Sequence, residues 1–469
     1  MSETANIGMR LDNLYLLLLP VERLSLKVNN ISGLQIFQFL RFSTFLIISI
    51  IFAKTSLSEG EIGDWEYVVF ITGAMSFFWV TGLIQSFLPL YKRNHAFARY
   101  HALGHTRSPE LYNAFLLMMV FSGFFALMIL LMNKSIPVLY KFEAVPYGLA
   151  TALFFFLGQT TSMIEYIYLL KDKPRHILYY GLISFGLQVV FACVPIFMGF
   201  GVEGAIWGMV AISFIKFIWL IRLLIRYASF RFSFPFIKEH LYIGYPVIIG
   251  CLLSGSAQYL DGLLAMILFE PERFAIFRYG AKELPFVVMM TTGLSNAMIP
   301  EFSAKKNLYE TLSTIRVKSL KMMHILFPLS MVFMLTSKYL FGVILFRDAF
   351  YRSADIFMVY QLLIMSRIIF PQTILLGLKK TRVIMTSSIL SILLNIPACI
   401  FFTKYYGVVG IALGSGLAYT LSKMFLAGYV WKKLKISPDK YIPVMWYLFY
   451  GALIILLFVL IDHRIIKPW

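Results

Sequence analysis

Apolar residues run through almost the whole chain in long blocks that short polar connections separate. The blocks reach ~20 residues again and again, which is the length of helix that crosses ~30 Å of hydrocarbon. Strands of a membrane barrel would instead be short and would alternate apolar with polar residues. The pattern predicts thirteen membrane-spanning helices, at residues 31–53, 66–90, 110–132, 146–170, 177–198, 202–225, 241–268, 274–300, 317–337, 354–377, 383–402, 408–430 and 441–461.

The N-terminal segment, residues 1–30, is the one long stretch outside these blocks. It contains a short apolar run, Leu14 to Leu19, that ends at Pro20. The run is too short to span a membrane, and no small-residue cleavage site follows it, which argues against a signal peptide. A helix lying in the membrane interface and a disordered tail fit this segment equally well. No polar stretch is long enough for a soluble domain, so we predict a single all-α, polytopic membrane unit.

The charge of the chain matters through its distribution. A net charge of +19 would suggest nucleic acid as the partner of a soluble protein. Here, however, 59% of the residues are hydrophobic and 14% are charged, which is typical of a membrane protein. Successive connections between spans lie on opposite sides of the membrane. The connections on the side of the N-terminus hold 26 of the 42 Lys and Arg residues, and those on the other side hold 10. Because positive residues accumulate in cytoplasmic loops, we predict a cytoplasmic N-terminus, an external C-terminus and no nucleic-acid partner.

Two internal repeats indicate that the chain consists of two similar halves. Segments 81–89 and 292–300 both read Thr-Gly-Leu, with Pro eight positions after the Thr. The glycine pattern of 201–208 returns at 407–414. Six spans per half give both halves the same orientation, so we predict two parallel six-helix bundles around a central cavity, as in many transporters. The predicted divisions are the N-terminal segment, the two bundles, and an extra C-terminal helix with its tail, at 1–30, 31–230, 231–435 and 436–469.

Structural roles account for most residues of these repeats. Glycines spaced four apart let two helices approach closely, and we assign that role to Gly204, Gly208, Gly410 and Gly414. Pro89 and Pro300 are interpreted as helix ends at the cytoplasmic interface rather than as kinks. The repeats therefore predict architecture, whether or not any one of these residues has a further function.

Charged residues inside the predicted spans indicate a site. The basic ones are Arg41, Lys216, Arg278, Lys282, Arg367 and Lys423. The acidic ones that are clearly embedded are Glu165, Asp261 and Glu283. A charge at the bilayer centre costs about 2.5–3.5 kcal/mol or more, so it faces a partner or a water-filled cavity. Since cations outnumber acids, pairing cannot neutralise them all, and we predict a cationic cavity between the halves with an anionic ligand. Arg suits phosphate because its guanidinium can bind two oxygens at once.

The residues predicted to bind this ligand are Arg41, Arg278, Arg367, Lys423 and Lys282. Arg278 and Lys282 are four residues apart, which would place them on one face of a helix. An ion pair between Asp261 and Lys282 is an equally good explanation for those two side chains. Lys216 is interpreted as extending toward the cytoplasmic face.

The sequence offers little for catalysis or for a metal. The three cysteines, Cys193, Cys251 and Cys399, all fall in apolar spans, and no Cys/His cluster has ligand spacing. A membrane polymerase or ligase would need a sizeable external loop, whereas the longest external connection, 338–353, has no His and no carboxylate pair beyond Asp348. We therefore predict no catalytic residue, no metal site and no enzyme activity.

With twelve core spans in two parallel halves and cations within the membrane, the chain resembles the multidrug/oligosaccharidyl-lipid/polysaccharide exporter superfamily. It is most similar to the polysaccharide-biosynthesis branch, the Wzx-type O-antigen flippases. Residues 279–284 and 296–303 look like the eighth span of that family, and the resemblance covers roughly 25–435. It implies alternating access that flips an undecaprenyl-pyrophosphate-linked oligosaccharide from the cytoplasmic to the outer leaflet of a bacterial inner membrane. It also implies coupling to a proton or sodium gradient, with Asp261 and Glu165 as candidates, and no bound cofactor.

The partners implied by the resemblance are the lipid-linked oligosaccharide, the bilayer and, as a candidate, polysaccharide polymerase machinery. The repeat unit could belong to O-antigen, capsule or exopolysaccharide. A multidrug or small-molecule exporter of the same superfamily is one alternative, although cationic drugs call for a cavity in which acids dominate. A lipid II flippase is another, although that branch typically has two extra C-terminal spans and this chain has one.

Overall fold

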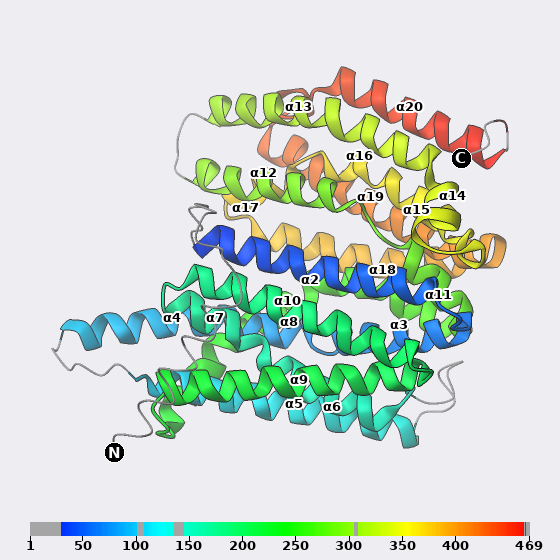
Figure 1. Ribbon diagram of the computed structural model, residues 1–469. Coiled ribbons are helices and arrows are strands. Elements are labelled where there is room, and N and C mark those ends of the chain that lie inside the picture. Colours follow the sequence, from blue (N-terminus) through cyan, green and yellow to red (C-terminus); the bar gives the residue numbers. More distant parts are fainter. Residues whose placement is uncertain (1–29, 101–106, 136–144, 304–307, 464, 466–469) are drawn as a thin grey trace, which may run out of the picture.

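The computed structural model describes residues 30–100, 107–135, 145–303, 308–463 and 465. Within these ranges the chain is almost entirely helical and contains no β-strand. Most of the long helices run along a common direction, and the later part of the chain lies above the earlier part in the view of Figure 1. The predicted all-α membrane fold is confirmed. The interpretation of the segment before residue 30 lies outside the described residues.

The helices of the first part of the chain are α2 (Asn30–Ala53), α3 (Glu59–Ala74), α4 (Phe77–Tyr100), α5 (Pro109–Ser135), α6 (Gly148–Thr160), η1 (Thr161–Met163), α7 (Ile164–Leu170), α8 (Pro174–Phe197) and α9 (Gly201–Tyr227). The later helices are α10 (Phe234–Leu268), α11 (Pro271–Gly280), α12 (Pro285–Ser303), α13 (Leu308–Leu335), α14 (Ser337–Tyr339), η2 (Leu340–Leu345), η3 (Asp348–Phe350), α15 (Ser353–Leu362), α16 (Ile364–Arg367), α17 (Pro371–Gly377), α18 (Thr381–Tyr406), α19 (Val408–Leu434), η4 (Pro438–Lys440) and α20 (Val444–Asp462).

The predicted count of thirteen continuous spans is not confirmed. Eleven helices of the described chain are long and apolar enough to cross a membrane, and a bent pair raises the number to twelve. The predicted span 274–300 is not among these twelve, because it consists of the two shorter helices α11 and α12. Gly280 ends the first helix and Pro285 begins the second, and a proline disfavours helical backbone at the residue before it. The break therefore leaves residues 281–284 outside a helix.

The bent pair is a second interruption in the later part of the chain. Residues 353–367 and α17 meet at an angle of 46°, and Pro371 is the first residue of α17. Interrupted helices at membrane depth are tolerated where the freed backbone groups are buried in protein or line a water-filled cavity. Arg367 is the last residue of α16, so it lies directly at this interruption.

The backbone supports the internal repeat. Asp172, between α7 and α8, has a φ of 52°, and Lys379, between α17 and α18, has a φ of 59°. The next residues, Lys173 and Lys380, each donate their backbone N–H to a carbonyl five residues earlier, at 3.0 and 2.8 Å. Two turns that lie 207 residues apart in the sequence thus have the same geometry. The boundaries of the two bundles at 230 and 435 stay a prediction.

Close helix packing explains Gly208 and Gly414, as predicted. A Cβ atom on Gly208 would lie 1.8 Å from the carbonyl oxygen of Phe191, and one on Gly414 would lie 2.5 Å from the backbone nitrogen of Cys399. These distances leave no room for a side chain, so α8 and α18 approach α9 and α19 through backbone atoms.

The two Thr-Gly-Leu copies have different surroundings. A Cβ atom on Gly82 of α4 would lie 2.5 Å from the side chain of Ile248 on α10, whereas the corresponding position on Gly293 of α12 has no heavy atom within 4 Å. One copy therefore lies in a packed helix contact and the other faces open space. The interpretation of Pro89 as a helix end is wrong, because α4 continues to Tyr100.

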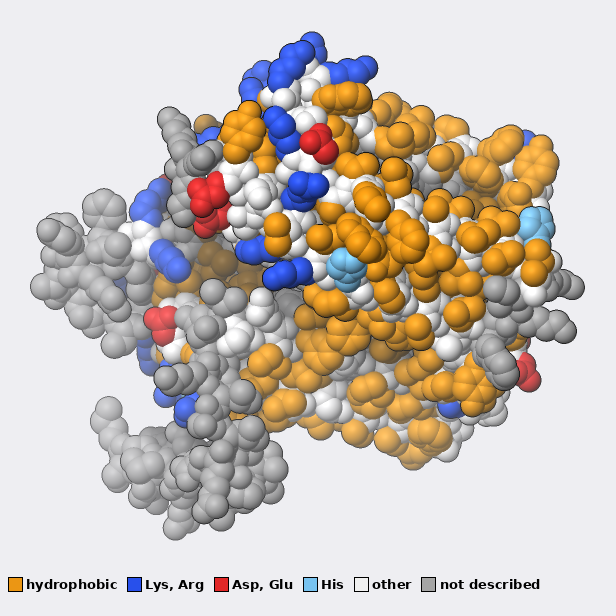
Figure 2. All heavy atoms as spheres, turned by 90° about the horizontal axis from the view of Figure 1, so that it is seen from above, with side chains coloured by type: hydrophobic (Ala, Val, Ile, Leu, Met, Phe, Trp, Pro, Cys, Tyr) orange, Lys and Arg blue, Asp and Glu red, His pale blue; other side chains and the backbone are white. Residues whose placement is uncertain are grey.

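Basic residues gather at one end of the molecule. In Figure 1 the end of α12 and the start of α13 lie at one end, and the end of α20 lies at the opposite end. On the face shown in Figure 2, Lys and Arg side chains cluster at one end, and hydrophobic side chains cover most of the remainder. An apolar belt with a basic end is the pattern of a multi-pass membrane protein.

Candidate functional site: charged networks within the membrane region

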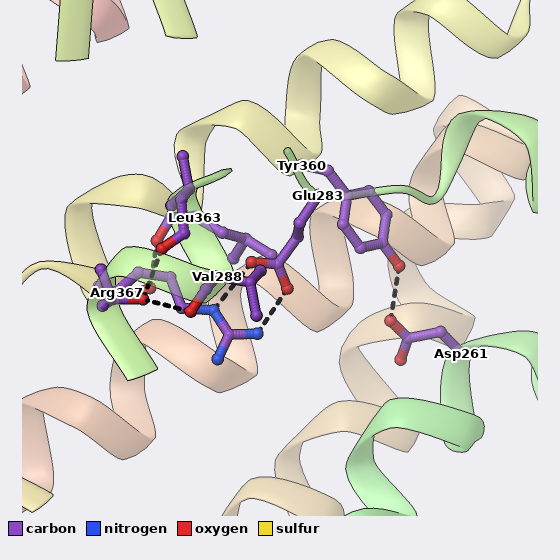
Figure 3. A network of polar contacts seen from close by, with 9 residues as sticks. Asp261, Glu283, Val288, Tyr360, Leu363 and Arg367 are labelled. Atoms are coloured by element: carbon purple, nitrogen blue, oxygen red, sulfur yellow. Dashed lines mark hydrogen bonds and ion pairs between the residues drawn. The ribbon is translucent and has the colours of Figure 1, made fainter. Parts of the chain in front are cut away.

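Arg367 and Glu283 form a two-pronged ion pair at the two helix interruptions. The Nε atom of Arg367 donates to Oε2 of Glu283 at 2.8 Å, and a terminal nitrogen of the same guanidinium donates to Oε1, as Figure 3 shows. The ring of Tyr419 on α19 lies 4.9 Å from the guanidinium centre. Glu283 belongs to the break between α11 and α12, so the unwound segment brings this carboxylate to Arg367.

A second ion pair connects α3 with α11. Nε of Arg278 lies 3.4 Å from Oε2 of Glu66, whose other oxygen accepts a hydrogen bond from the Ser49 hydroxyl at 3.1 Å. Tyr279 donates its hydroxyl proton to the backbone carbonyl of Ser49, also at 3.1 Å. Glu66 is only 4% exposed. The network therefore joins helices of the first part of the chain, α2 and α3, to α11.

Lys282 neither shares a helix face with Arg278 nor pairs with Asp261, the two arrangements that the sequence suggested. The break after Gly280 separates it from the helix that carries Arg278, so the two residues do not share a helix face. Its ammonium lies 5.1 Å from the ring centre of Tyr279 and 6.0 Å from that of Phe346. No ion pair with Asp261 exists in the described part of the chain, and the charges that act on Lys282 are those of Glu66, which attracts it, and Arg278, which repels it. The predicted Asp261–Lys282 pair is therefore wrong.

The two embedded lysines of α9 and α19 donate hydrogen bonds to glutamine side chains. Nζ of Lys216 lies 2.8 Å from Oε1 of Gln188, and Nζ of Lys423 lies 2.8 Å from Oε1 of Gln372. Lys423 also lies 5.4 Å from the Tyr419 ring centre, so it belongs to the same network as Arg367. Lys216 is thus held by a side chain of the neighbouring α8, and its extension toward the cytoplasmic face stays a prediction.

Asp261 on α10 is held by neutral groups from three other helices. Its Oδ2 accepts a hydrogen bond from Tyr360 of α15 at 2.8 Å, as Figure 3 shows. Its Oδ1 accepts from Ser415 of α19 at 2.6 Å and from Asn395 of α18 at 3.3 Å. No basic side chain forms an ion pair with it among the described residues. A carboxyl group in such surroundings can hold a proton or a small cation.

Arg41 and Glu165 are the last two of the site residues that the sequence predicted. Glu165 on α7 is 3% exposed, and its electrostatic partners are Arg41 and Lys216. Arg41 on α2 is exposed, and the described side chains give it no hydrogen bond, no close ion pair and no aromatic ring. Of the six basic residues predicted inside the spans, Arg41 is thus the one for which the described residues show no hydrogen bond, ion pair or ring contact.

The structure groups the predicted residues into separate networks rather than one cationic cluster. Arg278 and Lys282 lie near Glu66, and Arg367 and Lys423 share the Tyr419 ring. Arg41 joins neither group through a contact between described residues, and its charge acts on Glu165. Glu66 was missed by sequence reasoning because it stands at the first position of the predicted span 66–90. Its burial corrects the premise that only three acids lie within the membrane. No group of three His, Cys, Asp or Glu side chains in the described chain could hold a metal ion.

Several solved structures share this fold. The lipid II flippase MurJ, in an inward closed conformation, is 14% identical over 92% of this chain and 99% of its own, with a TM-score of 0.60. An inward-facing multidrug resistance MATE family transporter of the MOP superfamily is 14% identical over 87% of this chain and 98% of its own, with a TM-score of 0.62. A MOP superfamily transporter from Pyrococcus furiosus, described as having a binding pocket of reverse polarity, is 15% identical over 86% and 93%, with a TM-score of 0.55.

These similarities, together with the apolar helices and the internal repeat, define the class: a multi-pass membrane protein that shares the fold of these solved structures. No curated protein sequence matches the chain. A family model described as polysaccharide biosynthesis protein matches residues 103–348. Since this match covers more than half of the chain, the protein belongs to that polysaccharide biosynthesis family.

Proposed function

We propose that this protein moves a polyprenyl-pyrophosphate-linked oligosaccharide from the cytoplasmic to the outer leaflet of a bacterial inner membrane by alternating access. The family and the transporter fold support this assignment. The oligosaccharide would be an O-antigen, capsule or exopolysaccharide repeat unit, and polysaccharide polymerase machinery would receive it. The basic end of the molecule supports a cytoplasmic N-terminus.

The observation that carries the proposal is the available guanidinium of Arg41. A charged side chain within a membrane span is costly unless a partner or water stabilises it. The described residues supply no such partner for Arg41, although Glu165 acts on it electrostatically. A pyrophosphate offers several oxygens to a guanidinium, which can bind two of them at once. Arg41 is therefore our first candidate for the group that recognises the substrate.

The other predicted binding residues would act in a different conformation. Arg278 and Arg367 are engaged with Glu66 and Glu283, so neither is available to an anion in the present arrangement. Movement of one half against the other would break the contact between Arg278 and Glu66, which joins the halves. Release of Arg367 from Glu283 would instead need a rearrangement at the two helix interruptions of the second half. The open face of α12 at Gly293 supports a lateral path, along which the head group could enter while the lipid tail stays in the bilayer.

The proposed transport is tested by reconstituting the purified full-length chain in proteoliposomes that contain a polyprenyl-pyrophosphate-linked oligosaccharide. We expect protein-dependent movement of the head group across the bilayer, measured by its accessibility to an external glycosidase or lectin. Empty liposomes and liposomes with a denatured sample are the controls. If no head group moves under proton or sodium gradients, and cationic dyes are exported instead, the multidrug alternative is correct. The fourth embedded acid, Glu66, makes that alternative worth testing.

We also propose that Asp261 couples transport to a proton or sodium gradient. The variant Asp261→Asn keeps the size of the side chain but removes the negative charge and the site for a proton. We expect it to lose the stimulation that a gradient gives, while transport without a gradient remains. Initial rates in proteoliposomes, with and without each gradient, measure the effect. Glu239→Gln is the matched control, because this exposed acid pairs with Arg93 at 2.7 Å away from the buried networks. Equal stimulation of Asp261→Asn and wild type would exclude Asp261 and turn attention to Glu165.

A further inference from the structure

Three basic side chains surround a single tyrosine at the end of α9. The ring centre of Tyr227 lies 5.3 Å from Nζ of Lys171, 5.6 Å from Nζ of Lys173 and 5.5 Å from the guanidinium centre of Arg226. Two hydroxyls hold the lysines: Lys171 donates to Tyr91 at 2.8 Å and Lys173 donates to Tyr227 at 3.0 Å. The cluster thus places three positive charges around one ring, and two of them are held by hydrogen bonds.

This arrangement is unfavourable without a counter-charge. Like charges repel, and the partial burial of Lys171 lowers the pKa of its ammonium group, while the nearby carboxylate of Glu110 acts in the opposite direction. A bound anion would offset both effects. The cluster follows the last residue of α7 and lies in the last turn of α9, so it stands where a membrane helix reaches the lipid phosphates.

The basic end of any membrane protein carries lysines, so the cluster must be distinguished from an ordinary basic surface. The internal repeat supplies the comparison, because the α17–α18 turn has the same backbone geometry as the α7–α8 turn and carries Lys379 and Lys380. Both of these lysines are exposed, and neither contacts a ring or a hydroxyl among the described residues. The organised cluster of cations and tyrosines is therefore a feature of the first turn and not of its repeat.

We propose that Lys171, Lys173 and Arg226 form a binding site for the phosphate group of an anionic membrane lipid. The ring of Tyr227 and the hydroxyl of Tyr91 keep the cations in place, and the phosphate bridges them. This site is separate from Arg41 and from the paired arginines. Its occupation by a phospholipid does not depend on the proposed transport activity.

The test is a titration of the purified full-length chain in detergent with phosphatidylglycerol, followed by native mass spectrometry. Phosphatidylcholine with the same acyl chains controls for binding of the tails. We expect Lys171→Ala/Lys173→Ala to weaken phosphatidylglycerol binding on the order of 10- to 30-fold, given the usual contribution of each basic residue near a lipid surface. The matched variant Lys379→Ala/Lys380→Ala removes the same charge from the repeated turn and should change binding by less than about 3-fold if the site is organised as proposed.

A smaller loss is expected for Tyr227→Phe, which keeps the ring but removes the hydroxyl that holds Lys173. Equal losses in the two double variants would show an ordinary basic surface and would overturn the proposal, as would wild-type binding in all three variants.

Competition with a sugar-free polyprenyl diphosphate and with inorganic pyrophosphate identifies the source of the phosphate. If the polyprenyl diphosphate displaces phosphatidylglycerol more effectively than pyrophosphate does, the site serves the transported lipid, and that conclusion also rests on the proposed function. If it does not, the site holds a bulk phospholipid. A wild-type protein that binds phosphatidylglycerol but transports nothing would contradict only the proposed function.

Discussion

Replacing Arg41 with alanine is expected to lower transport by about 10- to 100-fold, since a hydrogen-bonded contact with a charged group contributes about 1.5–3 kcal/mol. The loss should be specific because Arg41 holds no described side chain in place, so its removal breaks no ion pair. Head-group movement in proteoliposomes measures the effect, and membrane insertion and thermal unfolding should stay close to wild type.

Two further variants make this result interpretable. Arg41→Lys keeps the charge but cannot bind two phosphate oxygens with one planar group, so we expect partial activity. Arg222→Ala removes another exposed arginine, from α9, and should leave transport unchanged. If Arg41→Ala transports at the wild-type rate, the anionic substrate is recognised elsewhere, and the paired arginines become the next candidates.

The overall fold could be predicted from the sequence because the hydropathy and charge patterns extend over whole helices and connections. Predicted spans such as 31–53 and 383–402 correspond closely to α2 and α18. The failure at 274–300 has a local cause. Gly280 and Pro285 interrupt the backbone inside a stretch that a span count treats as continuous, and only the folded chain shows that residues 281–284 are unwound.

The candidate site was harder to predict from the sequence, because its contacts join helices that are far apart in the chain. Basic residues could be located at membrane depth, but their partners could not be identified. Asp261 shows the difficulty: its donors Tyr360 and Ser415 lie 99 and 154 residues away. Glu66 shows another difficulty, since this carboxylate stands at the predicted edge of a span and was not counted among the embedded acids, yet it is buried. An excess of charge in a sequence therefore predicts that networks exist, but not which charge stays available.

Arg367→Ala is expected to destabilise the protein, whether or not Arg367 also binds the substrate in another conformation. Its guanidinium neutralises Glu283 through two hydrogen bonds, and the side chains are 27% and 19% exposed. Removing one member of a buried ion pair leaves the other charge without a partner, which costs about 3–5 kcal/mol. Thermal and denaturant unfolding in detergent should therefore show a large loss for Arg367→Ala, and transport should fall with the amount of folded protein.

The double variant Arg367→Ala/Glu283→Ala separates this explanation from a direct role in binding. With both charges gone, no carboxylate is left unpaired, so we expect stability to recover by more than half. Lys423→Met is the matched control, because it removes a cation beside the same Tyr419 ring but leaves only the neutral Gln372 without its partner. Its cost should stay near 1 kcal/mol, about that of one hydrogen bond. If the double variant is as unstable as Arg367→Ala, the contact with Tyr419 holds this interruption together instead. If it is stable but inactive, Arg367 binds the substrate once Glu283 releases it.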